Sequence, residues 1–226
     1  MEEDNIIKTS KEIRDKLKIE SDFMENPIDD TLDPVKPYWG KGEIKVIIIG
    51  QDPTIQNVKR RAEITCTLNL DKNGPLKKYI EEDICVGLGI TLENVYATNI
   101  FKYFYTKRPA TTFLILQNHL NENLNLLVNE LDQFQNATII TLGEPALQLL
   151  AGINSRVRNF WDYNKKTKKR NGKFLFSHSE DNLLSRDFFP FPHQPSLRKN
   201  FYRDHRFQYI EFVKKLSDDQ NYRKRY

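Results

Sequence analysis

The stretch Ile44-Lys45-Val46-Ile47-Ile48-Ile49-Gly50-Gln51-Asp52-Pro53 decides the fold class of this chain of 226 residues. Its β-branched run ends at Gly50, a pattern typical of a strand that is buried on both faces of a parallel sheet. The Gly50-Gln51-Asp52-Pro53 sequence favours a tight turn, which brings a carboxylate and backbone N–H groups to the end of the strand. Taken alone, such a turn serves simple chain reversal equally well. We expect the first core strand to end just before Gln51.

Three later segments repeat this arrangement of a short apolar run before loop residues. They are 94–97 before Thr98-Asn99, 137–142 before Gly143, and 188–191 before Pro192-His193. Helical spacing occupies residues 5–24, 74–84, 113–131 and 145–150. Strands that alternate with helices predict an α/β fold with three αβα layers around a central, mainly parallel sheet of four strands.

Ligands bind such sheets outside the carboxyl ends of the strands. Asp52, Asn99 and His193 are therefore expected to converge at one edge of the sheet, although they are far apart in sequence. The amide of Asn99 can donate and accept hydrogen bonds together, as reading the polar edge of a pyrimidine requires. His193 lies in a proline-rich loop where its ring can face a ligand. An ordinary turn asparagine and a surface histidine are the alternatives.

The length of the chain indicates its domain organisation, and its charge limits the kinds of partner that it can have. We expect a single domain over 1–226, with an N-terminal helix and extended loop over 1–40, a core over 41–215 and a basic tail over 216–226. Lysine plus arginine exceed aspartate plus glutamate by 35 to 31, which permits a polyanionic partner without requiring one. The clusters 165–170 and 223–225 concentrate positive charge that could meet phosphates, or could be solvated surface.

The two cysteines, Cys66 and Cys85, are too few for an iron–sulfur cluster or a four-cysteine zinc site, and we interpret both as buried reduced thiols. The apolar runs are far shorter than a membrane span, and the acidic start is unlike a signal peptide. We therefore expect a soluble, cytoplasmic protein without a membrane partner, and a monomer.

The motifs together resemble those of the uracil-DNA glycosylase superfamily, over residues 39–212. Classical members read Gly-Gln-Asp-Pro-Tyr-His after the first strand, then a strand that ends in a base-reading asparagine, and His-Pro-Ser-Pro-Leu-Ser near the end. The first four residues of the opening motif are identical here, and Thr138-Ile139-Ile140-Thr141-Leu142-Gly143 is similar to a further strand of the family. The resemblance implies hydrolysis of the N-glycosidic bond of uracil or a related deaminated base in DNA, as in base excision repair, without a metal or organic cofactor.

The same resemblance implies a role for each matching residue. Asp52 would position water or stabilise the oxocarbenium-like sugar, and His193 would donate a hydrogen bond to the base O2. Gln51 would bind the base through its backbone N–H, and Asn99 would select uracil-like edges. Leu197 matches the leucine that fills the gap left by a flipped nucleotide, although an ordinary buried leucine fits equally well. Ser196, Arg198 and Lys199 would contact the DNA backbone.

Several positions depart from the family pattern. Thr54 replaces the tyrosine that crowds the thymine methyl group, and Ile55 replaces the following histidine, so thymine in G·T mispairs should compete better than in classical members. The family's stacking aromatic has its counterpart in Cys66-Thr67-Leu68-Asn69, which carries no ring. Phe101 is a candidate substitute, with core packing as its alternative role. Gln194 replaces a proline in the closing motif.

Alternatives remain open at the level of residue and of function. His178, after the apolar run 174–176, competes with His193 for the catalytic role, although the composition around His193 is closer to the family motif. The missing tyrosine and ring also fit a relative without catalysis that binds DNA or another protein. A nucleotide-binding α/β hydrolase outside the family is a third hypothesis, which the lack of a glycine-rich phosphate loop disfavours.

Overall fold

The computed structural model describes residues 2–17, 19, 28–107, 113–164, 166–167, 169–170 and 172–219. The end of the first expected helix, two lysines of the 165–170 cluster and the basic residues 223–225 lie outside this part of the chain. No helix within the described part is long and apolar enough to cross a membrane.

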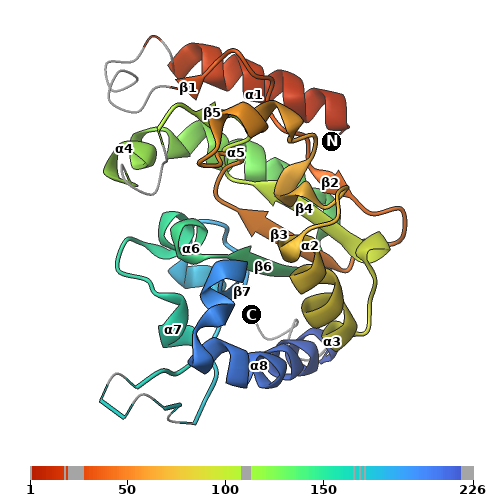
Figure 1. Ribbon diagram of the computed structural model, residues 1–226, viewed down its shortest axis with the longest axis vertical. Helices are drawn as coiled ribbons and strands as arrows, with labels where there is room; N and C mark the ends of the chain where they lie inside the picture. The colour runs from red at the N-terminus through yellow and green to blue at the C-terminus, as the bar shows by residue number, and fades with distance from the viewer. Residues whose placement is uncertain are drawn as a thin grey trace.

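The centre of the molecule is a five-stranded sheet in the order β2-β4-β3-β6-β7 (Figure 1). Its strands are β2 (Tyr38–Trp39), β3 (Val46–Gly50), β4 (Val95–Asn99), β6 (Thr138–Leu142) and β7 (Phe188–Phe191). The last four are parallel, as the sequence predicts, and all their residues are buried. The two-residue strand β2 adds an antiparallel edge on β4, and it is too short to carry a sequence pattern.

The direction in which successive strands are added across the sheet reverses at its centre. From β3 the chain passes to β4 on one side, then crosses to β6 on the other side and continues outward to β7. The gap between the loops after β3 and β6 is therefore a topological switch point, where open α/β sheets bind ligands. A separate two-stranded antiparallel sheet joins β1 (Ile28–Asp29) to β5 (Phe104–Tyr105).

Helices cover both faces of the sheet, which explains the uninterrupted apolar strands. In Figure 1 α1 (Glu3–Leu17) and α5 (Leu120–Leu131) lie together on one side, and α3 (Val86–Leu88) and α8 (Asn200–Asp218) on the other. The remaining α-helices are α2 (Pro75–Lys78), α4 (Phe113–Asn118), α6 (Glu144–Ala151) and α7 (Val157–Phe160). Short 3-10 helices are η2 (Val58–Glu63), η3 (Thr67–Asn69), η5 (Leu92–Asn94), η7 (Asp132–Phe134), η8 (Ser179–Asp181) and η9 (Gln194–Arg198).

Two of the expected helices are broken. The segment 74–84 divides into α2, the π-helix η4 (Tyr79–Cys85) and α3, and the wider π turn buries Tyr79, Ile80, Ile84 and Cys85 together. The segment 113–131 breaks at His119, whose buried ring stacks on Tyr105 with 6.0 Å between centroids. Both breaks allow contacts with distant segments, and such contacts cannot be predicted from the local periodicity of the sequence.

Candidate active site

The carboxyl ends of the four parallel strands surround one cavity of about 540 Å³. Six residues expected from the sequence line it: Gln51, Asp52, Thr54, Asn99, His193 and Ser196. The other lining residues are Gly50, Pro53, Ile55, Gln56, Ile64, Leu68, Asn69, Leu76, Leu142, Gly143, Glu144 and Pro145. The structure thus brings together the three strand-end loops whose polar residues the sequence singles out.

Gly50 and Asn99 face each other in the parallel pairing of β3 with β4. A Cβ atom on Gly50 would lie 2.3 Å from Asn99 Oδ1 and 3.3 Å from a methyl group of Leu68. No side chain fits in that space, so glycine is required for the asparagine to lie against the strand end. The glycine of the opening motif therefore shapes the cavity as well as the turn.

Two polar atoms at this cavity are buried and have no hydrogen-bond partner among the described residues. They are Asn99 Oδ1 and Gln51 Nε2, and Asn99 as a whole is 1% exposed. Buried polar groups are nearly always hydrogen-bonded in folded proteins, because desolvation without a partner costs about 1–3 kcal/mol. An acceptor and a donor left open beside one cavity are complementary to a ligand that carries both kinds of group.

The Asp52 turn is held by its own hydrogen bonds. Asp52 Oδ1 accepts from the N–H of Thr54 at 2.7 Å, and the Thr54 hydroxyl oxygen accepts from the N–H of Tyr105 at 2.9 Å. The carbonyl oxygens of Gly50 and Gln51 accept from the N–H groups of residues 100 and 101, at 3.0 and 2.9 Å. The carboxylate therefore sits on a turn whose backbone is fixed against the continuation of β4.

Arg61 clamps the loop that follows this turn. Its buried guanidinium donates to the carbonyl oxygens of Ile55 at 3.2 Å, Tyr105 at 2.7 Å and Thr106 at 3.3 Å. One of its nitrogens also lies 3.6 Å from a carboxylate oxygen of Asp29. No local pattern distinguishes Arg61 from its exposed neighbour Arg60, since the distinction depends on contacts with distant segments.

His193 reaches the cavity because of the turn at Gly143. That glycine has φ +91°, and a Cβ on it would lie 3.3 Å from His193 Cβ. Its N–H donates to the carbonyl of Phe191 at 2.8 Å, which ties the ends of β6 and β7 together. The N–H of Ser196 donates to the carbonyl of His193 at 2.8 Å, and this bond closes the turn.

The rival His178 lies elsewhere. Ser177 pairs with Phe188, the first residue of β7, whereas His193 lies two residues beyond the last residue of that strand. The His178 ring packs on Phe176 at 4.2 Å and is not part of the cavity lining. The structure therefore brings His193, and not His178, to the cavity that contains Asp52.

Phe101 does not line the cavity. Its fully buried ring packs against Tyr103 and Tyr105, with centroid distances of 6.2 and 5.8 Å, so it occupies the core position that was its alternative role. The counterpart stretch contributes two lining residues, Leu68 and Asn69, and both have an unusual positive φ, of +58° and +51°. Left-handed backbone in a bulky residue is strained, and such strain clusters at functional sites.

The cavity lining does not include the next three residues after Ser196, which are Leu197, Arg198 and Lys199. Leu197 is partly buried against the core, while Arg198 and Lys199 are exposed. They follow Ser196, which lines the cavity, so the two exposed cationic residues come shortly after a lining residue in the chain.

A family model described as the uracil DNA glycosylase superfamily matches residues 37–216. The chain belongs to the uracil DNA glycosylase superfamily. Members of this superfamily are in general DNA glycosylases, hydrolases that act on DNA. A comparison with curated proteins found no matching relative. The matched region contains every residue that lines the cavity.

Glu144 is a further acidic residue of the site that the sequence motifs of the superfamily do not indicate. It begins α6 directly after Gly143 and contributes a second carboxyl group to the cavity lining. Arg156 Nε lies 3.3 Å from its Oε1, in a half-exposed ion pair. The rule that strand ends carry functional loops would have found it, because it follows the end of β6.

Neither cysteine of this glycosylase-superfamily chain is suited to nucleophilic chemistry. Both are buried and free, as the sequence predicts. Burial raises the pKa of Cys66 to about 11 and that of Cys85 to about 12. The Cys66 thiol also donates to Asp71 Oδ1 at 3.0 Å, which favours its protonated form. Both side chains are therefore thiols at neutral pH.

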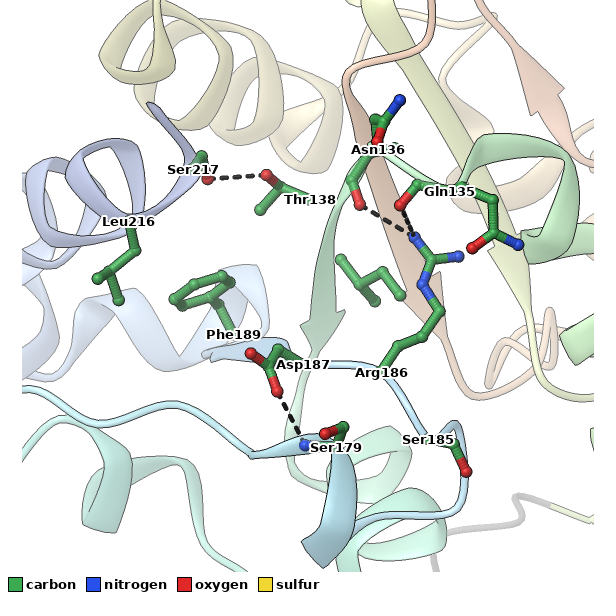
Figure 2. A pocket seen from close by; sticks show the side chains of 12 residues that line it. Gln135, Asn136, Thr138, Ser179, Ser185, Arg186, Asp187, Phe189, Leu216 and Ser217 are labelled. Carbon is green, nitrogen blue, oxygen red and sulfur yellow. Dashed lines mark hydrogen bonds between the residues drawn. The ribbon is translucent and has the colours of Figure 1, made fainter. Parts of the chain in front are cut away.

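A second cavity, of about 380 Å³, lies at the opposite ends of β6 and β7 (Figure 2). Figure 2 shows Arg186 directed at the backbone around Gln135, and its guanidinium donates to the carbonyl oxygens of residues 131, 134, 135 and 137. Asp187 Oδ1 accepts from the N–H of Ser179, and the Thr138 hydroxyl bonds Ser217. These bonds satisfy the end of α5 and join α8 to the sheet, so we assign the chemistry to the cavity that contains Asp52.

Proposed function

We propose that the protein is a monofunctional DNA glycosylase that hydrolyses the N-glycosidic bond of uracil or a related deaminated base in DNA. The observation that carries the proposal is the joint presence of Asp52, His193 and the unpartnered atoms of Asn99 and Gln51 on one cavity. This arrangement supplies a carboxylate for the sugar and open hydrogen-bonding groups for the base.

The base must leave the helical stack to reach such a cavity. Once inside, a uracil-like edge offers a ring N–H to Asn99 Oδ1 and a carbonyl oxygen to an N–H donor of residue 51. Cytosine presents an exocyclic amine where uracil presents an acceptor, so this pair of atoms favours uracil. Hypoxanthine and xanthine also combine a carbonyl with an adjacent ring N–H, which is why the proposal includes deaminated purines.

Bond cleavage separates charge between the sugar and the base. As the N-glycosidic bond breaks, positive charge develops at C1′ and its bonding electrons go to the base. Asp52 stabilises this cation and orients the water that adds to C1′, while His193 donates a hydrogen bond to the oxygen of the departing base. Water supplies the hydroxyl of the abasic sugar, and the base leaves with a proton.

The rim supplies the contacts to the rest of the DNA. Leu197 fills the space that the flipped nucleotide leaves, and Ser196, Arg198 and Lys199 bind the neighbouring phosphates. One chain carries all of these groups, and we propose that the protein acts as a monomer.

The pocket should tolerate larger pyrimidines than uracil. Thr54 contributes a short side chain whose hydroxyl is already bonded to Tyr105, and Leu68 replaces an aromatic ring. A 5-methyl group therefore meets no tyrosine ring at this position. Thymine opposite guanine is expected to be a weak substrate.

Purified protein should be incubated with oligonucleotides that carry one uracil, hypoxanthine, xanthine or mispaired thymine, in single-stranded and duplex form. Alkali then cleaves the strand wherever a base has been released. Product on at least one deaminated base, released much more slowly by Asp52→Asn, supports the proposal. No product on any of these substrates would refute it and would leave a non-catalytic DNA-binding relative as the better account.

A further inference from the structure

A buried polar network lies directly behind Asn99. Lys102 is 1% exposed and Glu130 is fully buried, and their Nζ and Oε1 atoms are 2.6 Å apart. The ammonium group of Lys102 also donates to the backbone carbonyl oxygen of Asn99 at 2.8 Å. A charged donor therefore holds the main chain of the residue whose side chain faces the cavity.

The other oxygen of Glu130 binds β4 from the side of α5. Its Oε2 accepts from the hydroxyl groups of Tyr96 at 2.9 Å and Thr98 at 2.8 Å. Those two residues are two apart on the strand, so their side chains share one face, and Asn99 leaves from the opposite face. Glu130 and Lys102 thus connect α5 to the last residues of β4 without entering the cavity.

Stability alone gives little reason to bury these charges. Removing an ammonium and a carboxylate from water carries a large desolvation penalty, and an apolar pair of similar volume is often at least as stable. The contribution of the pair is to position Asn99. Lys102 holds the backbone carbonyl of Asn99 on one side, and the missing side chain of Gly50 leaves space for Asn99 Oδ1 on the other.

We propose that Lys102 and Glu130 are positioning residues that hold Asn99 in the orientation in which it reads the base. The inference rests on the proposed function and deepens it. With its carbonyl anchored by Lys102, Asn99 keeps Oδ1 against Gly50 as a preorganised acceptor. Without that anchor, the residue can turn its amide away from the base edge.

The test is the double variant Lys102→Met/Glu130→Gln. Glutamine still accepts from Tyr96 and Thr98, and methionine fills the space of the lysine without leaving an unpaired charge. Only the donor to the Asn99 carbonyl and the ion pair are lost.

Three properties should be compared with the wild type. They are kcat/KM on uracil DNA, inhibition by free uracil, and the side-chain amide signals of Asn99 in ¹⁵N NMR. The amide signals can be assigned from their loss in Asn99→Asp.

We expect kcat/KM and the affinity for free uracil to fall about 10- to 100-fold, the range that misplacement of a positioned group produces. The Asn99 amide signals should broaden or split, while affinity for undamaged DNA stays unchanged. The matched control is Asp83→Asn, which breaks the ion pair between Asp83 and Arg206 at 3.1 Å, on the other face of the sheet. It should lower stability without changing any of the three properties.

Unchanged Asn99 signals and unchanged uracil inhibition in a folded double variant would overturn the inference. If that variant does not fold, Lys102→Arg keeps the charge beside Glu130 but alters the donor to Asn99, and the same measurements decide. Wild-type protein that releases no base defeats the proposed function instead. In that case the NMR comparison still decides whether Lys102 and Glu130 position Asn99.

Discussion

The side-chain oxygen of Asn99 occupies the space that a side chain on Gly50 would need, since a Cβ there would lie 2.3 Å from it. The two residues face each other at the ends of β3 and β4. One residue of the opening motif therefore decides where the proposed base reader can lie.

Gly50→Ala should displace Asn99 and impair function. Overpacking of this kind costs about 1–3 kcal/mol of unfolding free energy, and the displaced amide should lower kcat/KM at least as strongly as the loss of one hydrogen bond. Urea unfolding and base-release kinetics measure the two effects. Gly74→Ala is the control, because a Cβ on Gly74 has no neighbour within 4 Å. Equal unfolding free energies and equal kcat/KM values for the two variants would contradict the close approach of Asn99 Oδ1 to Gly50.

Arg61→Met should destabilise the protein by about 3 kcal/mol, because it removes the donor to three carbonyl oxygens and leaves the Asp29 carboxylate without its buried partner. Arg60→Met removes a similar charge from the surface, where the ion pair of Arg60 with Glu63 at 3.2 Å is exposed, and should change stability by less than about 0.5 kcal/mol. Denaturant midpoints compare the two. A similar shift for both would show that Arg61 does not clamp the loop.

Leu68→Phe should strengthen binding of the base. Stacking of a base on an aromatic ring contributes about 1–3 kcal/mol, so KM for uracil DNA should fall by about tenfold if the new ring reaches the base. Leu76→Phe places a ring on another lining position of the same cavity and serves as the comparison. An unchanged KM for Leu68→Phe would mean that Leu68 does not face the bound base.

The two thiols should resist alkylation in the folded protein. The pKa of Cys66 is raised to about 11 from an ordinary value of 9.0, so the folded state retains the proton between these values while the unfolded state loses it. Stability should therefore decline as pH rises from 9 towards 11. Iodoacetamide labelling at pH 8, followed by mass spectrometry, should be slow in buffer and fast in urea. Rapid labelling of the native protein would contradict the burial of both groups.

The strand framework follows from the sequence because buried parallel strands need continuous apolar runs, and 46–49 is such a run. The order of the strands brings Asp52, Asn99 and His193 together, which is why local motifs are enough to predict the cavity. The sequence favours His193 over His178 because of the composition and spacing of the motif around it, and the structure adds that the bridge of Ser177 to Phe188 places His178 at the other end of β7.

Other features depend on contacts that no local pattern encodes. Lys102 and Glu130 are far apart in sequence, with the helix break at His119 between them. They form an ion pair only because α5 packs against the end of β4. Arg61 and its neighbour Arg60 are alike in sequence, and only the contacts of Arg61 with β1 and β5 distinguish the two. Phe101 looks equally able to face a ligand or the core, and the aromatic cluster with Tyr103 and Tyr105 decides for the core.

The most direct test of the account is a single-turnover assay of base release from a uracil-containing oligonucleotide, with wild-type protein and Asp52→Asn. The asparagine oxygen can still accept from the N–H of Thr54, so the turn should keep its shape while the charge is lost. We predict release by the wild type and a rate about 10²- to 10³-fold lower for the variant, the usual effect of removing one group that stabilises transition-state charge. Equal rates for the two proteins would contradict the role of Asp52, and no release by either would contradict the proposed activity itself.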